Sequence, residues 1–321
     1  MFYTLSLALN TALYHHAARA FAAAAVRPAS TVPLSVMTVN SLSGEVEMTR
    51  SSLRTIIHQL EDDTPRALST IGLLKHAIEG RVLCKIHING WPSFNTIICE
   101  VIYPRASEVA DILCYSRGSG EDVLQLILSN NLISWGRRQQ IYYLESKFSD
   151  YLSENLLDPS TGGRVLKPSK EYVSAYFPKG SQIKEIPCPD GFVLGHLNSR
   201  HIPLLAKHWG KFHGWTSSPY YISKLILDFE TIALYSVNDL DIPVAWILQN
   251  PFGRPSSIYI TEEYRGMNLG TLLTVEMFKA VTSQGLIPET FTELGNNFRN
   301  ITAKLGGIES DYTLKWLLLE H

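Results

Sequence analysis

The sequence predicts a mixed α/β protein in which helices and strands pack in layers. Three observations support this fold class. The chain has 321 residues, enough for roughly two domains. Its residues are 45% hydrophobic and 18% charged, which suits a globular protein with a substantial core. Short β-rich runs also occur among segments with helical spacing of apolar residues, a pattern typical of layered α/β structures.

The first part of the chain contains both kinds of element. Apolar residues at Leu53, Ile56, Ile57 and Leu60 form a helical stripe, which predicts a helix over 49–62. Two β-rich runs are separated by a turn-type sequence, and two more helices follow. The predicted strands cover 84–88 and 96–103, the turn 89–92, and the further helices 122–128 and 137–152.

The composition changes after residue 157. The stretch from 158 to 191 is rich in Gly, Pro and Lys and has little periodicity, which favours a connection between domains. We therefore expect a leader over 1–48, an amino-terminal domain over 49–165, a linker over 166–190 and a carboxyl-terminal domain over 191–321. In the last of these, strands are predicted over 192–197, 231–236, 244–249, 256–260, 289–294 and 312–319, and helices over 199–212, 219–228, 267–283 and 297–304.

The leader has a composition of its own. No Asp or Glu occurs before Glu45, and basic residues lie among alanines, leucines and serines. Such an acid-free, potentially helical segment resembles a mitochondrial transit peptide. The alternatives are a start at Met37 or Met48, or an alanine-rich disordered tail. The expected location is the mitochondrial matrix, otherwise the cytoplasm, and residues 1–48 are left out of the predicted fold.

Charge and cysteine usage exclude several classes of partner. Lys and Arg total 28 against 30 for Asp and Glu, a net charge of -2, which argues against nonspecific binding to nucleic-acid phosphates. No charge-free apolar run is long enough to span a bilayer. The four cysteines lack CxxC spacing, so we expect buried thiols, without a disulfide frame or a metal site. We expect no nucleic-acid or membrane partner, and we favour a monomer.

The segment that indicates chemistry is Tyr264–Thr271, between a predicted strand and the longest predicted helix. A turn from strand to helix exposes backbone N–H groups at the positive end of the helix dipole, where phosphate groups bind. Gly266 and Gly270 allow the backbone to approach an anion closely. The segment lacks the GxGxxG dinucleotide fingerprint and the Gly-Lys-Ser/Thr ending of a P-loop.

This segment is similar to the Arg/Gln-x-x-Gly-x-Gly/Ala pyrophosphate loop of the GNAT acyltransferases, with Arg265 first and Gly270 last. Asn268 replaces the middle glycine, and asparagine is among the residues that best tolerate left-handed geometry. Across 49–321 the chain resembles the glycine N-acyltransferase-like family of the GNAT superfamily. The matching segments are Gly90–Ile98, Ile133–Trp135 followed by Gln139, His208–Phe212, Pro243–Trp246, Glu263–Arg265 and Asn297.

The resemblance implies a GNAT fold in the carboxyl-terminal half, preceded by a divergent GNAT-like half. It also implies an enzyme that transfers an acyl group from acyl-CoA, its co-substrate, to the amine of glycine or another small amino acid. A backbone N–H around Ser257–Ile260 is expected to bind the thioester carbonyl. The implied cofactor-binding residues are Tyr259, Ile260, Arg265, Gly266, Met267, Asn268, Leu269, Gly270 and Thr271.

One position departs from the family. Its general base is a glutamate, and counting without gaps from Pro243 and from Arg265 places Arg254 there. A guanidinium cannot accept a proton and would repel an ammonium group. We hypothesise that glycine conjugation is slow and that Arg254→Glu raises it.

The catalytic base therefore stays unassigned. Another group can act through a water, the acceptor can differ from glycine, or the chain is a weak or inactive relative. The groups considered are Glu262, Glu263, Asp241 and His196. The alternative functions are a noncatalytic acyl-CoA-binding relative that lost the base and a GNAT enzyme that acylates protein amines.

Overall fold

The computed structural model describes residues 38–41, 44–47, 49–103, 111–135, 139–157, 166–213 and 219–319. All of them belong to one compact unit that covers 33–321. Within these ranges, no helix is both long enough and apolar enough to cross a membrane. The part of the leader before residue 38 lies outside the described residues, so the expectation of a transit peptide stays a prediction.

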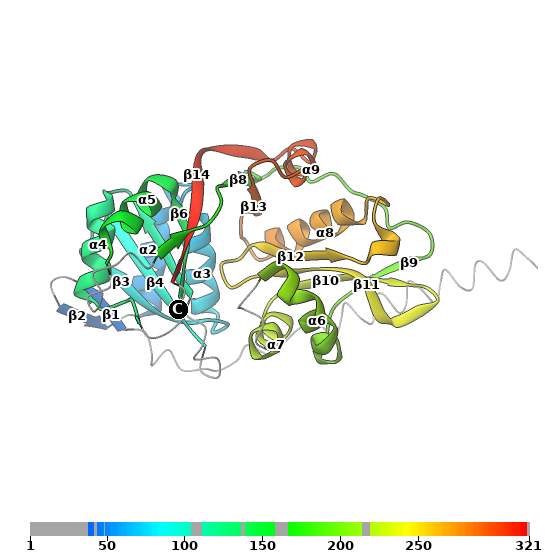
Figure 1. Cartoon of the computed structure of the whole chain (residues 1–321), viewed down its shortest axis with the longest axis horizontal. Coiled ribbons are helices and arrows are strands. Elements are labelled where there is room, and N and C mark those ends of the chain that lie inside the picture. The colour runs from blue at the N-terminus through cyan, green and yellow to red at the C-terminus, as the bar shows by residue number, and fades with distance from the viewer. Residues whose placement is uncertain are drawn as a thin grey trace, which may run out of the picture. The chain divides into compact units, whose positions relative to one another are not determined.

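The amino-terminal half covers β1 to α5 (Figure 1). Its first helix, α2, begins after Thr49, whose hydroxyl accepts a hydrogen bond from the Ser52 amide at 3.1 Å. The half consists of β1 (Thr38–Ser41), β2 (Gly44–Glu47), α2 (Arg50–Glu61), α3 (Leu68–Ile78), β3 (Leu83–Ile88), β4 (Thr96–Ile102), β5 (Asp111–Ser116), α4 (Gly120–Ser129), β6 (Gln139–Glu145) and α5 (Ser146–Asn155).

Two short strands, β7 (Leu166–Pro168) and β8 (Tyr172–Tyr176), lead to the carboxyl-terminal half, which covers β9 to β14. That half consists of β9 (Phe192–Gly195), a 3₁₀ turn (Ser199–His201), α6 (Ile202–His213), α7 (Pro219–Asp228), β10 (Thr231–Ser236), β11 (Asp239–Gln249), β12 (Pro255–Ile260), a second 3₁₀ turn (Glu262–Tyr264), α8 (Leu269–Ser283), β13 (Glu289–Glu293), α9 (Phe298–Lys304) and β14 (Ile308–Leu319).

Two sheets carry these elements. The larger has ten strands in the order β13-β8-β14-β6-β5-β4-β3-β1-β2, with β7 paired to β14, and the smaller has the order β12-β11-β10-β9. The long β14 belongs to both halves, because it follows α9 but pairs antiparallel with β6 and β8. The last strand of the chain therefore completes the sheet of the first half.

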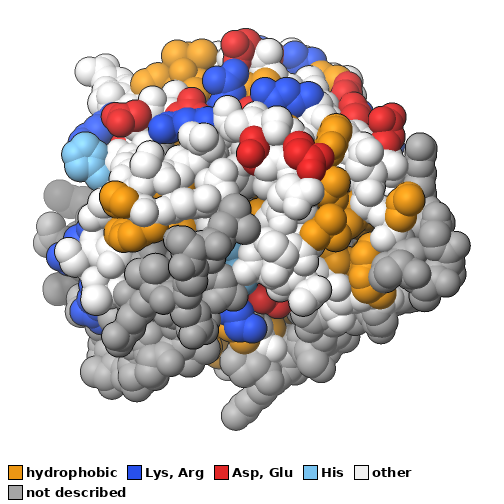
Figure 2. All heavy atoms as spheres, turned by 90° about the vertical axis from the view of Figure 1, so that its left-hand side faces the viewer, with side chains coloured by type: hydrophobic (Ala, Val, Ile, Leu, Met, Phe, Trp, Pro, Cys, Tyr) orange, Lys and Arg blue, Asp and Glu red, His pale blue; other side chains and the backbone are white. Residues whose placement is uncertain are grey.

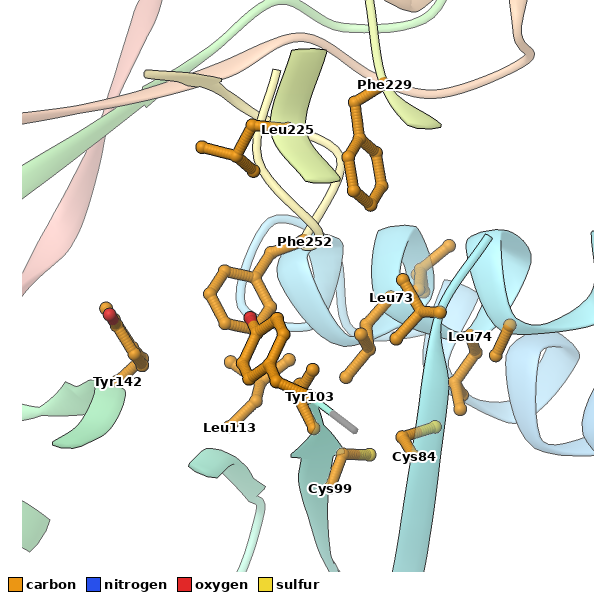
Figure 3. Close-up of a cluster of buried hydrophobic side chains, with 14 of the residues drawn as sticks. Leu73, Leu74, Cys84, Cys99, Tyr103, Leu113, Tyr142, Leu225, Phe229 and Phe252 are labelled. Carbon is orange, nitrogen blue, oxygen red and sulfur yellow. The ribbon is translucent and has the colours of Figure 1, made fainter. Parts of the chain in front are cut away.

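The two halves share one hydrophobic core. Phe252, in the loop after β11, lies in the same cluster as Leu73 of α3 and Tyr103, which follows β4 (Figure 3). At Gly72 a Cβ atom would lie 2.2 Å from the carbonyl oxygen of Phe252, so only glycine fits where α3 meets this loop. The ammonium group of Lys75 donates to the Gly285 carbonyl at 2.8 Å, a second link between the halves.

Several predicted elements are confirmed, whereas others were wrong or missed. Residues 139–145 form β6, not the first half of a helix, because this segment is buried between β5 and β14 and shows no helical stripe. Two elements, α3 and β5, were not predicted from the sequence. Both are almost entirely buried, so neither shows alternation of polar and apolar faces.

The expected leader and linker also contain structure. Residues 38–47 were left out of the predicted fold, but β1 pairs in parallel with β3 and in antiparallel fashion with β2. The expected linker over 166–190 contains β7 and β8, and β8 pairs with both β13 and β14. Backbone pairing supplied by distant strands orders these segments, and their own periodicity gives no sign of it.

The surface and three of the four cysteines agree with what the composition predicts. In Figure 2, acidic and basic side chains are interspersed over the described part of the face shown. Cys84, Cys99 and Cys114 are buried, and burial raises the pKa of Cys84 to about 12. Cys188 is only half-buried, which differs from the prediction.

Candidate functional site

The candidate site begins where two strands of the carboxyl-terminal half separate. β12 is an edge strand of the smaller sheet, whereas β13 is an edge strand of the larger sheet, next to β8. In Figure 1, β13 is drawn with β8 and β14, apart from the smaller sheet. We call the space between β12 and β13 the wedge. An extended ligand can lie along a strand edge of this kind, since its backbone groups face outward.

A β-bulge lies in the middle of β12. Trp246 pairs with Tyr259 and Leu248 pairs with Ser256, so two residues of β12, Ser257 and Ile258, oppose one residue of β11. Ser257 has φ of 54°, in the left-handed region, which is uncommon for a residue with a side chain. The bulge bends β12 within the segment where the sequence predicted an amide for the thioester carbonyl.

The loop between β12 and α8 turns through two left-handed residues. Gly266 has φ of 82° and Asn268 has φ of 59°. Asn268 occupies the N-cap position of α8, and its side-chain carbonyl accepts a hydrogen bond from the Thr271 hydroxyl at 2.5 Å. Asn268 therefore adopts the left-handed conformation that glycine adopts most readily.

The amides of this loop are available at the helix start. The backbone N–H groups of Tyr264, Arg265 and Thr271 donate hydrogen bonds to backbone carbonyl groups of the same segment. Within the described residues, no protein acceptor is bonded to the amides from 266 to 270. Since these N–H groups lie at the positive end of the 15-residue helix α8, they form an anion-binding turn. We call residues 265–271 the anion loop.

The side chains of the anion loop divide into buried anchors and exposed groups. Leu269 is buried in the core under α8. A Cβ atom at Gly270 would lie 3.3 Å from Cδ1 of Ile260, so glycine allows α8 to approach β12 closely. Met267 is 46% exposed. Arg265 is half exposed and bonds the Ile260 carbonyl through Nε at 3.2 Å.

The amino-terminal half has a counterpart of this loop that is closed. There β5, α4 and β6 repeat the strand–helix–strand order, but β5 and β6 are hydrogen-bonded in parallel, so no wedge separates them. Asp122 accepts from the Ser119 amide at 2.6 Å, and its own amide donates to the Ser119 hydroxyl. The amide and the hydroxyl of Ser119 both donate to the Asp122 carboxylate and lower its pKa. This carboxylate occupies the helix start where an anion would bind.

The structure corrects the interpretation of Arg254. Its guanidinium does not face an open acceptor site, because the side chain is only 5% exposed and pairs with Glu289 at 2.9 Å. The guanidinium carbon also lies 3.5 Å from the centroid of the Phe291 ring. Burial raises the pKa of Glu289, whereas Arg254 and the Ser174 hydroxyl oppose this effect. Glu289 is 35 residues from Arg254, so no spacing rule could have indicated this pair.

The other predicted base candidates are dispersed and lie at the surface. Glu262 and Glu263 are exposed, and Glu262 lies 3.6 Å from Arg265. Asp241 pairs with Arg200 at 3.1 Å with its side chain 81% exposed. The exposed His196 bonds the Thr231 carbonyl through Nδ1 at 2.6 Å.

The structure brings a different histidine to β12. The ring of His208, on α6, lies 4.5 Å from the ring of Tyr259, which is two residues after the bulge at Ser257. Tyr259 is in turn stacked on Trp246 at 4.6 Å. His208 is half-buried. No sequence pattern singled out His208, because only tertiary packing brings α6 to this face of β12.

This geometry agrees with the comparisons to known proteins. Residues 234–316, from β10 into β14, match a family described as FR47-like protein. The structure of a protein from Drosophila aligns with a TM-score of 0.70 at 14% identity, over 85% of this chain and 97% of that chain. Together with the likeness to a GCN5-related N-acetyltransferase, this alignment assigns the GNAT fold to the carboxyl-terminal half.

A second solved structure supports this assignment. A GCN5-related N-acetyltransferase from Kribbella flavida aligns with a TM-score of 0.51 at 11% identity, over 80% of this chain and 94% of that chain. No curated protein matches the sequence. In the GNAT fold of this chain, the wedge and the anion loop lie together in the carboxyl-terminal half.

Proposed function

We propose that the protein is an acyl-CoA-dependent N-acyltransferase that uses glycine or another small amino acid as acceptor. The observation that carries the proposal is the anion loop, whose amides at the start of α8 have no acceptor among the described residues. The GNAT fold and the separation of β12 from β13 support it. The amino acid acceptor rests on the resemblance to the glycine N-acyltransferase-like family.

Each part of the site has a role in this reaction. The amides from 266 to 270 bind the pyrophosphate of coenzyme A, with the dipole of α8 adding to the attraction. The pantetheine arm, which contains amide groups, extends along the edge strand β12 toward the bulge at Ser257. The acceptor amine attacks the thioester carbonyl, and a backbone N–H near the bulge stabilises the oxyanion. The CoA thiolate is the leaving group.

The amine must lose a proton to become a nucleophile. Of the groups described above, His208 has the position that fits this role, because it is half-buried and its ring contacts Tyr259 of β12. An imidazole accepts a proton near neutral pH, as a general base requires. We therefore assign proton acceptance to His208 within the proposed reaction.

A second function has its own support. The family's base position holds Arg254, whose side chain is engaged in a buried ion pair and cannot accept a proton. A protein that binds acyl-CoA without transferring the acyl group would keep the anion loop and lose the base. The two functions differ in turnover but not in binding.

The decisive experiment measures binding and turnover separately. Calorimetry with CoA tests the anion loop, and released thiol is followed with acetyl-, benzoyl- and phenylacetyl-CoA against a panel of free amino acids. Met267→Glu places a carboxylate on the exposed rim of the loop and is expected to weaken CoA binding, whereas the matched Met267→Gln keeps it. Equal affinities in these two variants would refute the assigned phosphate site. Binding without thiol release would favour the noncatalytic alternative.

A further inference from the structure

The path of the acyl chain follows from the direction of β12. The anion loop lies at the carboxyl end of this strand, and Arg254 immediately precedes its first residue. β12 has six residues, which span about 20 Å at 3.3 Å per residue. A CoA thioester whose pyrophosphate is held by the loop therefore directs its acyl group toward the amino-terminal end of β12.

A buried ion pair closes the wedge at that end. Arg254 precedes β12, Glu289 is the first residue of β13, and their side-chain charges are 2.9 Å apart. The guanidinium also lies against the ring of Phe291, the third residue of β13. Both charged side chains are almost completely buried, with 5% and 1% exposure. Two strands that belong to different sheets are thus linked here by their side chains.

A cavity borders this pair. Its volume is about 230 Å³, and both Arg254 and Glu289 contribute to its lining. A water molecule occupies about 30 Å³ in the liquid, so the cavity has room for an apolar tail of several carbon atoms. Most of its exposed lining is apolar, with contributions from both halves of the chain: Ile71, Phe177, Ile183, Phe252 and Leu286.

We propose that the Arg254–Glu289 pair sets the maximum length of the acyl chain by separating the wedge from this cavity. The proposal rests on the acyl-CoA site proposed above. A short acyl group ends before the pair. A longer chain would have to displace two buried charges from each other, and a hydrocarbon tail offers neither of them a hydrogen bond. The wild-type protein therefore accepts short acyl groups, although the cavity that the pair borders has space for longer ones.

The test compares two double variants that differ in volume. Arg254→Ala/Glu289→Ala removes both charges and opens the passage, whereas Arg254→Met/Glu289→Met removes the charges and keeps the passage filled. The ligands are CoA and its S-ethyl, S-butyl, S-hexyl and S-octyl thioethers, which cannot transfer an acyl group. Calorimetry gives the affinity of each, and circular dichroism verifies that each variant is folded.

The wild type is expected to bind the S-ethyl and S-butyl compounds and to gain no affinity from longer chains. In the alanine pair, each further methylene should increase affinity by up to about four-fold, as burial of a methylene allows. The methionine pair, which keeps the passage filled but lacks the ion pair, should lie between the wild-type and alanine profiles. If the alanine pair does not fold, the wild-type and methionine series decide the matter.

Two results separate failure of this proposal from failure of the proposed function. If CoA binds but wild-type affinity rises steadily through S-octyl-CoA, the length limit is wrong and the CoA site stands. Identical profiles for the two double variants would also overturn the limit. If CoA itself does not bind to the wild type, both the site and the limit are wrong.

Discussion

Replacing Arg254 by glutamate is expected to destabilise the protein and not to create an active base. The substitution places a second carboxylate beside Glu289, whose side chain is 1% exposed. It also removes the cation that lies over Phe291. The sequence alone favoured the opposite result, because the family that the chain resembles has a glutamate at this position.

The size of the expected destabilisation follows from the burial of the ion pair. Removing one partner of a buried ion pair costs about 3–5 kcal/mol, since the remaining charge has no compensating partner. Both partners here are at most 5% exposed, so solvent does not screen the loss. The free energy of unfolding of a typical domain is about 5–15 kcal/mol, so this loss is a large part of the total stability.

The assay is urea unfolding followed by circular dichroism at pH 7.5. Arg254→Glu should lose at least about 3 kcal/mol, and the reversed pair Arg254→Glu/Glu289→Arg should regain part of it. Glycine conjugation is measured in parallel through released thiol. If Arg254→Glu is as stable as the wild type and conjugates glycine faster, then the ion pair has no structural role and residue 254 faces the acceptor.

Three further predictions concern other parts of the chain. His208→Gln should reduce acyl transfer by about 10²–10⁴-fold and leave calorimetric CoA affinity unchanged; unaltered turnover would remove His208 from the mechanism. Ser119→Ala removes the capping box of α4 and should cost about 1 kcal/mol in urea unfolding without altering CoA affinity, because the closed loop of the first half binds no anion. Burial raises the pKa of Asp111 to about 6 from 3.8. A carboxyl group with a raised folded-state pKa destabilises the folded state above its unfolded pKa, so the wild type should lose stability as the pH rises from about 4 to 6. The variant Asp111→Asn, which keeps an acceptor for the Tyr103 hydroxyl, should gain up to about 3 kcal/mol over the wild type at pH 7.5 and almost nothing at pH 3.5. An equal difference at both pH values would contradict this assignment.

Much of the carboxyl-terminal half could be predicted from the sequence. The helix α8 has a long run of apolar residues at helical spacing, and the anion loop before it is a local feature of strand, glycines and helix start. Such features depend on residues only a few positions apart, so a local pattern predicts them.

The amino-terminal half was less predictable. β6 was expected to be helical because its buried residues lie next to the helix α5 in the sequence, and α3 gave no signal because nearly all of its residues are buried. When both faces of an element are covered, polar and apolar residues no longer alternate with its period.

The sequence by itself predicted a turn at residues 265–271 and the order of strands and helices around it. It also showed the departure at residue 254 from the family that the chain resembles. Only the tertiary structure decided that Arg254 pairs with Glu289, that His208 reaches β12, and that the first half's own loop is closed by Asp122. It also decided that β14 completes the sheet of the first half. The physical reason is that burial and pairing depend on groups that are distant in the chain, whereas a sequence pattern reports only the conformation of its own segment.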